Sequence, residues 1–269
     1  MVVVESPGMR LSNQRDVEVA AAALAAGMFV AHAFANLYAL TTRADAGTVR
    51  AVNIFKGRAA DQVGSVTTTP VRLSGVFDLD RLPALLTAST VLGLIDELLC
   101  LGPFGFRGPA AAHIPDHLTV PSAGGRWVQA IVPGDRCASN AFLAACLDLC
   151  GTDHLHITSA NRSRHATGAP EEPAHYRAGP LRAEFSGATQ LLVLEHPDED
   201  AAALAYPRHA PMSTTVLGFR HGRCERRPSV VVERYGSLDL DDVRAVVGRH
   251  GLGLDIASGA RHRLPQRRY

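Results

Sequence analysis

The chain has 269 residues, of which 46% are hydrophobic and 20% are charged, and its formal net charge is +1. At this length it can bury a substantial core without support from disulfides or metals. The near-neutral charge argues against a surface that is basic all over and binds nucleic acid or membranes without specificity. It is compatible with a basic groove at one place on the surface.

Helical and strand-like patterns alternate along the chain from residue 16. Alanine and leucine between Asp16 and Gly27 favour a first helix with a cap and a stop. A loosely alternating strand and turn follow, and a helical stripe of apolar residues then leads to Lys56. Further helices are predicted at 78–102, 138–151 and 237–251, and strands at 126–133, 154–163 and 189–196. A further strand is predicted in 64–76, with an end near Pro70, and two or three strands joined by turns in 213–236. Residues 102–116 are predicted to form a loop rich in glycine and proline.

This interleaving predicts one α/β domain over residues 16–250, with a twisted mixed sheet flanked by helices. Residues 1–15 are interpreted as an N-terminal extension. The basic residues 251–269 are interpreted as a C-terminal tail that frays. The sequence has no GxGxxG, Walker or GxSxG motif, so the familiar routes to nucleotide binding and hydrolysis are absent.

The cysteines and the N-terminus favour a cytoplasmic protein. The five cysteines form an odd set without a CxxC pair, which makes a disulfide framework unexpected. Cys146 and Cys150 lie one helical turn apart, which is typical of a buried helix face, and we predict no metal site. Residues 1–16 lack a basic stretch before an apolar run, and residues 19–40 are too rich in alanine to span a bilayer.

Lys56 is the only lysine, and the other 26 of the 27 basic residues are arginine. A lysine kept against such a bias suits a site where a compact ammonium meets a phosphate or carboxylate oxygen and the planar fork of arginine does not fit. Arg58 could add bidentate contacts to the same anion. The alternative is a solvated helix end at which the lysine survived by chance.

Two further segments carry polar groups that suit a ligand. Ser159 and Asn161 belong to TSANRS, at the end of a predicted strand, where ligands of α/β sheets commonly bind. Ser213 opens STTV and Arg234 lies in ERYG, and hydroxyls with an arginine suit phosphate or ribose. The alternatives are an ordinary Asx or Ser turn and an ordinary hairpin.

In this order, the segments resemble the Sua5/YrdC/YciO/YwlC family of threonylcarbamoyl-adenylate synthases. The resemblance runs from about residue 16 to about residue 250. AFANLYAL at 33–40 stands where the family has PTDTVYGL, and KGRAADQVG from Lys56 stands at its KGRP. The remaining matches are LGPFG at 101–105 for WPGPLT, QAIVP at 129–133 for VRVP, SANRSR at 159–164 for SANxSG, STTVL at 213–217 for STVVD, and RYG at 234–236 for RxG.

The resemblance implies a single YrdC-like domain around a concave, positively charged cavity. It also implies an enzyme that makes threonylcarbamoyl-AMP and pyrophosphate from ATP, bicarbonate and L-threonine for tRNA modification, with magnesium accompanying ATP. tRNA or tRNA-modifying proteins are then possible partners. The implied roles are catalytic for Lys56 and Arg58, nucleotide binding for Ser159, Asn161, Ser213 and Arg234, and substrate-pocket lining for Asn36 and Tyr38.

The departures from the family gather around the amino-acid pocket. Phe34 and Asn36 replace the two threonines of PTDT, and Ile131 replaces the arginine of VRVP. A pocket that loses such polar partners loses selectivity for a hydroxylated substrate. We therefore expect an adenylating scaffold whose acceptor need not be threonine. The alternatives are a relative that uses another amine or a carbamoyl group in a specialised pathway, and a non-catalytic module that binds a nucleotide or RNA.

Overall fold

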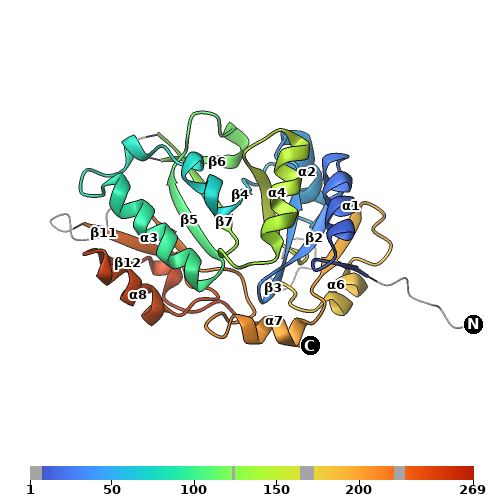
Figure 1. Ribbon diagram of the computed structural model, residues 1–269. Helices are drawn as coiled ribbons and strands as arrows, with labels where there is room; N and C mark the ends of the chain where they lie inside the picture. Colours follow the sequence, from blue (N-terminus) through green and yellow to red (C-terminus); the bar gives the residue numbers. More distant parts are fainter. Residues whose placement is uncertain (1–7, 123–124, 164–172, 221–227) are drawn as a thin grey trace, which may run out of the picture.

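The structure, a computed structural model, describes residues 8–122, 125–163, 173–220 and 228–269. Within them twelve strands form one sheet in the order β1-β9-β2-β3-β8-β4-β7-β5-β10-β11-β12, with β6 paired to β7 (Figure 1). The pairs β4/β7 and β5/β10 are parallel, whereas β2/β3, β3/β8 and β5/β7 are antiparallel. The prediction of an α/β domain with a mixed sheet is confirmed. The strands are β1 (Met9–Arg10), β2 (Phe29–Phe34), β3 (Leu37–Thr42), β4 (Ser65–Thr67), β5 (Phe104–Pro109), β6 (Thr119–Ser122), β7 (Gly125–Val132), β8 (Leu155–Ser159), β9 (Leu191–Glu195), β10 (Val216–Gly218), β11 (Ser229–Arg234) and β12 (Gly253–Ile256).

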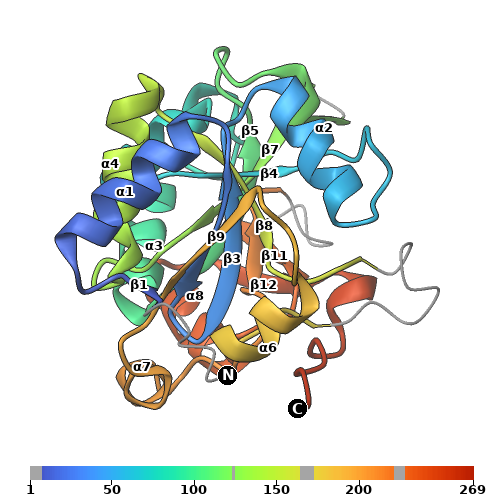
Figure 2. The same ribbon diagram turned by 90° about the vertical axis from the view of Figure 1, so that its right-hand side faces the viewer.

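Helices flank the sheet on both sides. Figure 2 shows α1 and α4 on one side of strands β2, β3 and β9, with α2 and α6 toward the other side. None of the described helices is long and apolar enough to cross a membrane. The helices are α1 (Gln14–Ala25), α2 (Ala46–Phe55), α3 (Ala88–Leu101), α4 (Ser139–Cys150), α6 (Ala178–Glu184), α7 (Glu199–Ala205) and α8 (Leu240–Arg249), and the longest 3₁₀-helix is η1 (Pro70–Val76).

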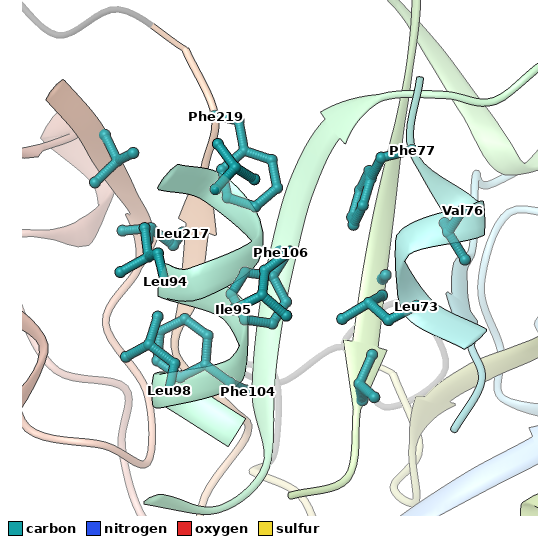
Figure 3. Close-up of a cluster of buried hydrophobic side chains, with 14 of the residues drawn as sticks. Leu73, Val76, Phe77, Leu94, Ile95, Leu98, Phe104, Phe106, Leu217 and Phe219 are labelled. Atoms are coloured by element: carbon teal, nitrogen blue, oxygen red, sulfur yellow. The ribbon is translucent and has the colours of Figure 1, made fainter. Parts of the chain in front are cut away.

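Two large hydrophobic cores hold the helices to the sheet. One joins α3, α8 and η1 to strands β5, β7, β10 and β11, and Figure 3 shows its centre, where Leu94 and Leu98 of α3 face Phe104 and Phe106 of β5. The other joins α1, α4 and α6 to β2 and β9. A third, small cluster consists of residues of the sheet, most of which line the candidate site described below.

Two predicted elements are wrong. The loop predicted at 102–116 contains β5, in which Phe104 and Phe106 alternate with Gly105 and Arg107 and are fully buried. The strand predicted in 64–76 ends at Thr67, close to the expected end, because Pro70 begins a 3₁₀-helix. The tail after residue 250 does not fray: β12 pairs with β11, and Arg267 donates to the carbonyl oxygen of Pro173 at 2.8 Å.

Candidate functional site

The C-terminal end of α2 places Lys56 and Arg58. The Asp45 side chain caps the helix by accepting hydrogen bonds from the backbone and hydroxyl of Thr48. Lys56 is the C-cap, and Gly57 follows with φ of 74°, a left-handed conformation that glycine adopts without strain. This turn directs Lys56 and Arg58 toward the end of β8.

Lys56 is fully buried. Its Nζ donates to Thr158 Oγ1 at 3.0 Å and to the carbonyl oxygen of Ser159, while Arg58 Nη1 donates to the same Thr158 Oγ1 at 2.7 Å. Ser163 ties the two segments together, because its backbone N–H donates to the carbonyl of Lys56 and its hydroxyl to that of Gly57. The solvated helix end considered as the alternative for Lys56 is therefore wrong.

Thr158 is a shared acceptor for two cations. A hydroxyl oxygen has two lone pairs and one proton. Because Lys56 and Arg58 both donate to Oγ1, the hydroxyl proton is left to donate to another group. Thr158 and Arg58 both line the neighbouring cavity, so an oxygen of a bound ligand is a suitable acceptor for that proton.

A cavity of about 200 Å³ opens beside this cluster. Arg58 and Arg234 are the charged residues among those lining it, and both are basic. Its other lining residues are Phe34, Leu37, Ala39, Gln62, Val63, Gly64, Ser65, Gln129, Ile131, Ile157, Thr158, Ser159, Ser213 and Thr214.

The wall opposite Arg58 comes from the segment before β10 and the end of β11. Arg234 donates from Nε to the carbonyl oxygen of Thr214 at 2.8 Å and from Nη2 to Thr214 Oγ1 at 2.9 Å. Gly236 packs so closely that a Cβ there would lie 2.1 Å from the carbonyl oxygen of Ser213. The lack of a side chain at Gly236 thus fixes Ser213 and Thr214 beside Arg234.

The predicted substrate-pocket residues Asn36 and Tyr38 lie elsewhere. Successive residues of a strand point to opposite faces, and Leu37 and Ala39 are the ones that line the cavity. Tyr38 donates from its hydroxyl to Glu199 at 2.6 Å, and burial followed by this carboxylate raises the pKa of Tyr38. Asn36 donates to the carbonyl of Tyr206 at 3.0 Å, in a separate cavity that it shares with Tyr38.

Asn161 is buried under the turn that follows β8. Its side-chain amide donates to the carbonyl of Arg162 at 2.7 Å, and it is not among the residues that line the cavity. Of the eight predicted site residues, the structure brings Arg58, Ser159, Ser213 and Arg234 to the cavity and Lys56 into direct contact with Ser159.

His156 stays uncharged next to the two cations. Burial, and then the positive charges of Lys56 and Arg58, lower its pKa to about 3. Its Nδ1 lies 3.1 Å from Thr42 Oγ1, and its ring occupies the space that a side chain at Gly64 would need. The ring therefore adds no charge to the site at neutral pH.

Comparison with solved structures supports the fold. The chain matches a P. abyssi Sua5 complexed with L-threonine with a TM-score of 0.63 and 17% identity, over 95% of this chain and 66% of that one. A variant of the same Sua5 gives 0.63 and 18%, over 91% and 59%. E. coli YciO gives 0.55 and 15%, over 82% and 89%. The chain has the YrdC-like fold. The sequence matches no protein-family model and no curated protein.

The YrdC-like fold confirms the architecture that the motif order predicted. This chain spans less than two thirds of the length of the Sua5 structures it matches. The identities of 15–18% leave the activity as a proposal.

Sequence reasoning missed Thr158, Ser65 and Gln129. Thr158 directly precedes the SAN signature. Because threonine is common in strands, its position at the end of β8 did not mark it as a site residue. Gln129 donates to Ser65 Oγ at 2.7 Å and accepts from Arg107 Nη2 at 2.7 Å. Ser65 lies in β4 and Gln129 in β7, and their positions in the sequence do not indicate that these two strands are neighbours. Only the order of strands in the sheet shows that the two side chains meet.

The binding-module alternative would need phosphate contacts, which six arginines (162, 164, 220, 223, 226 and 227) could supply. The two in the described part of the chain contact other groups of the protein. The Arg162 guanidinium lies over the Phe185 ring at 5.3 Å, and Arg220 pairs with Glu233 at 2.8 Å. The other four, at positions 164, 223, 226 and 227, lie outside the described residues.

Proposed function

We propose that the protein is an adenylating enzyme that joins a carbamate, formed from bicarbonate and an amine, to the α-phosphate of ATP. The products are an acyl-adenylate and pyrophosphate. The observation that supports this most is the pair of cations, Lys56 and Arg58, converging on Thr158 beside a cavity whose far wall carries Arg234.

The chemistry needs positioning and charge neutralisation more than a nucleophilic side chain. The amine nitrogen bonds to the carbon of bicarbonate with loss of water. A carbamate oxygen then attacks the α-phosphorus, and the bond to pyrophosphate breaks. Arg58 would neutralise an oxygen of the carbamate or the phosphate. The Thr158 hydroxyl would donate a hydrogen bond to that oxygen, and the buried Lys56 ammonium would hold this hydroxyl in place.

The cavity volume suits the reacting groups rather than the whole nucleotide. At about 200 Å³ it would hold the carbamate and its amine, with the nucleoside extending past Ser213 and Arg234 at the opposite wall. Magnesium would arrive bound to the ATP phosphates, because none of the described residues form an acidic or histidine cluster that would hold the ion alone. A basic lining that includes Arg58 fits such a complex.

Incubation with ATP, magnesium, ¹⁴C-bicarbonate and a panel of amines tests the proposal. We expect pyrophosphate release together with a labelled acyl-adenylate that depends on both bicarbonate and an amine. Hydrolysis of ATP to ADP, or no turnover with any amine, would contradict it. Binding of a nucleotide or RNA without turnover would then favour the binding module.

Thr158→Val tests the shared hydroxyl. The change keeps the shape of the side chain and removes the hydroxyl that Lys56 and Arg58 share. Because loss of one preorganised donor at a reacting oxyanion typically costs about 10²–10³-fold in kcat, we expect a loss of that order. The melting temperature should also fall, because the buried Lys56 ammonium loses one of its acceptors. Arg58→Met should lose at least as much. Arg50→Met, an exposed position on the same helix, is the matched control and should keep full activity.

A further inference from the structure

The floor of the cavity is apolar, although its rim is cationic. Phe34, Leu37, Ala39, Ile131 and Ile157 line it and pack together with Val216 as a separate cluster. Each of these six side chains is at most 9% exposed.

The sheet register sets these residues on one face. Phe34 pairs with Leu37 across β2/β3, and residues directly paired across a sheet point to the same side. Ile157 pairs with Ser65 across β8/β4, and Ile131 pairs with Gly105 across β7/β5. The floor is thus a row that crosses the centre of the sheet.

Gly105 closes the row. A Cβ at this position would lie 2.8 Å from Ile131 Cδ1 and 2.7 Å from Val216 Cγ2. Without that atom, the Ile131 and Val216 side chains meet above β5 and make the floor continuous with β10.

Two polar side chains next to the row, those of Gln129 and Ser65, are hydrogen-bonded to each other. Gln129 donates to Ser65 Oγ, and Arg107 donates to Gln129 Oε1. Arg107 also pairs with Glu233 at 2.8 Å. A hydroxyl placed on the floor would lose its water and meet methyl groups and a ring, which is unfavourable for a polar group.

We propose that the amine acceptor of this enzyme carries a branched apolar group without a hydroxyl, seated on the floor formed by Phe34, Ile131 and Ile157. The inference rests on the proposed adenylation and names the substrate class for the same site. The amine nitrogen and its carbamate face Arg58 and Thr158 at the rim, while the apolar group displaces water from the floor.

L-Valine and L-threonine provide a matched pair, because they have the same shape and differ by a methyl and a hydroxyl. We expect kcat/KM for valine to exceed that for threonine by about 10²-fold, the discrimination usual for one group in an apolar pocket. Isobutylamine, which keeps the branched group of valine and lacks its carboxylate, tests whether the acid group is recognised. Calorimetric binding of all three compounds, with ATP and magnesium present, gives a readout that does not need turnover.

A second matched pair lies in the floor itself. Ile131→Val and Ile131→Thr remove the same volume, but only the threonine adds a hydroxyl. We expect Ile131→Val to keep the preference for valine and Ile131→Thr to reduce it at least tenfold. Equal preferences in the two variants would overturn the assignment of Ile131 to the substrate floor.

The outcomes separate the inference from the function on which it rests. Adenylate formed equally well, or better, with threonine overturns the apolar acceptor and keeps the adenylation. Tighter binding of valine or isobutylamine than of threonine, without adenylate, supports the apolar floor and overturns the adenylation. Failure of all three compounds both to bind and to react overturns the apolar acceptor, and the adenylation is overturned with it when the wider panel of amines also gives no adenylate.

Discussion

Gly236 is a residue whose role is purely spatial. A Cβ there would lie 2.1 Å from the Ser213 carbonyl oxygen and 2.5 Å from the Thr214 carbonyl carbon, and both obstacles belong to the backbone. Backbone cannot rotate away as a flexible side chain can. The segment that carries Ser213 would have to shift, and Arg234, which bonds Thr214 twice, would move with it.

Gly236→Ala should therefore reduce both stability and activity. We expect a loss of about 1–3 kcal/mol in the free energy of unfolding, as is usual for overpacking, measured by urea denaturation. Gly248→Ala is the control, because nothing lies within 4 Å of its added methyl and the residue is in α8. It should raise stability by up to about 1 kcal/mol, because alanine favours a helix more than glycine does. Equal effects of the two changes would refute the packing argument.

For single residues, the sequence predicted which segments meet at the site better than it predicted the side of a strand to which each side chain points. The motif order brought Lys56 and Arg58 to the SAN turn, because a helix end and a strand end were both marked by polar residues. It could not place Tyr38, since a shift of one residue along a strand moves a side chain to the other face. The structure settles that Leu37 and Ala39 face the cavity.

Helix α2 is the element that carries the cations, and its first turn is held by one side chain. Asp45 accepts from Thr48 N at 3.0 Å and from Thr48 Oγ1 at 2.8 Å. Partial burial raises the pKa of Asp45, but these bonds and the nearby Arg43 outweigh it, so the pKa lies below its usual value. The carboxylate therefore stays ionised as a cap at neutral pH.

Asp45→Ala should cost about 1 kcal/mol in the free energy of unfolding, the usual value of an N-cap. Thermal or urea unfolding at pH 7 measures the loss. Asp80→Ala removes the same charge at an exposed position in a short 3₁₀-helix without a side-chain cap, and it should change little. If both variants lose the same stability, general charge effects rather than the cap are responsible.

Helices and strands whose residues all favour one structure could be predicted from the sequence. Segments whose residues favour different structures could not. Helices α1, α2 and α8 have a side-chain cap and an apolar stripe, whereas α4 has an apolar stripe and a terminal glycine at 151 but no side-chain cap. In the segment 102–109, which includes β5, two prolines and three glycines favoured the prediction of a loop over that of a strand, despite the alternation of Phe104 and Phe106. Burial on the sheet decided in favour of the strand, because neither proline needs to donate to a neighbour at its position.

The molecule as a whole buries several histidines in uncharged form. Burial lowers the pKa of His32 to about 3, that of His156 to about 3 and that of His209 to about 4, all from 6.5. His32 Nε2 lies 2.8 Å from Thr41 Oγ1, and His209 is held between Ser237 and the carbonyl of Leu101. Each ring takes up a proton more readily in the unfolded chain.

Stability should consequently fall steeply on mild acidification. Above pH 6.5 the three rings are neutral in both states and carry no penalty. Burial also lowers the pKa of His154 and His196, so below pH 6.5 the unfolded state binds at least three more protons. The free energy of unfolding should then drop by at least about 4 kcal/mol per pH unit. Since total stability is commonly about 5–15 kcal/mol, we expect unfolding near pH 5. Urea denaturation at several pH values between 7 and 5 measures the slope.

A single substitution checks the origin of this slope. His209→Gln should reduce it by about 1.4 kcal/mol per pH unit, whereas His262→Gln, at an exposed position, should leave it unchanged. Carboxylates contribute little to this slope, because their unfolded pKa near 4.5 lies below the pH window. For Glu184, burial raises the pKa, but the hydrogen bond with His175 and further partners lower it to about 2, so its stabilising contribution is lost only as pH falls below about 4.5. A flat profile between pH 7 and pH 5 would contradict the role of the buried rings.

The row of apolar residues under the cavity joins positions that are distant along the chain. Phe34 of β2 and Val216 of β10 stand at its two ends, and five strands lie between them in the sheet, of which β3, β8 and β7 contribute residues to the row. Such long-range pairings form slowly, because each one closes a long loop first. No excised piece of the protein should recover the binding surface, and refolding followed by ligand capture should lag behind the formation of the local helices.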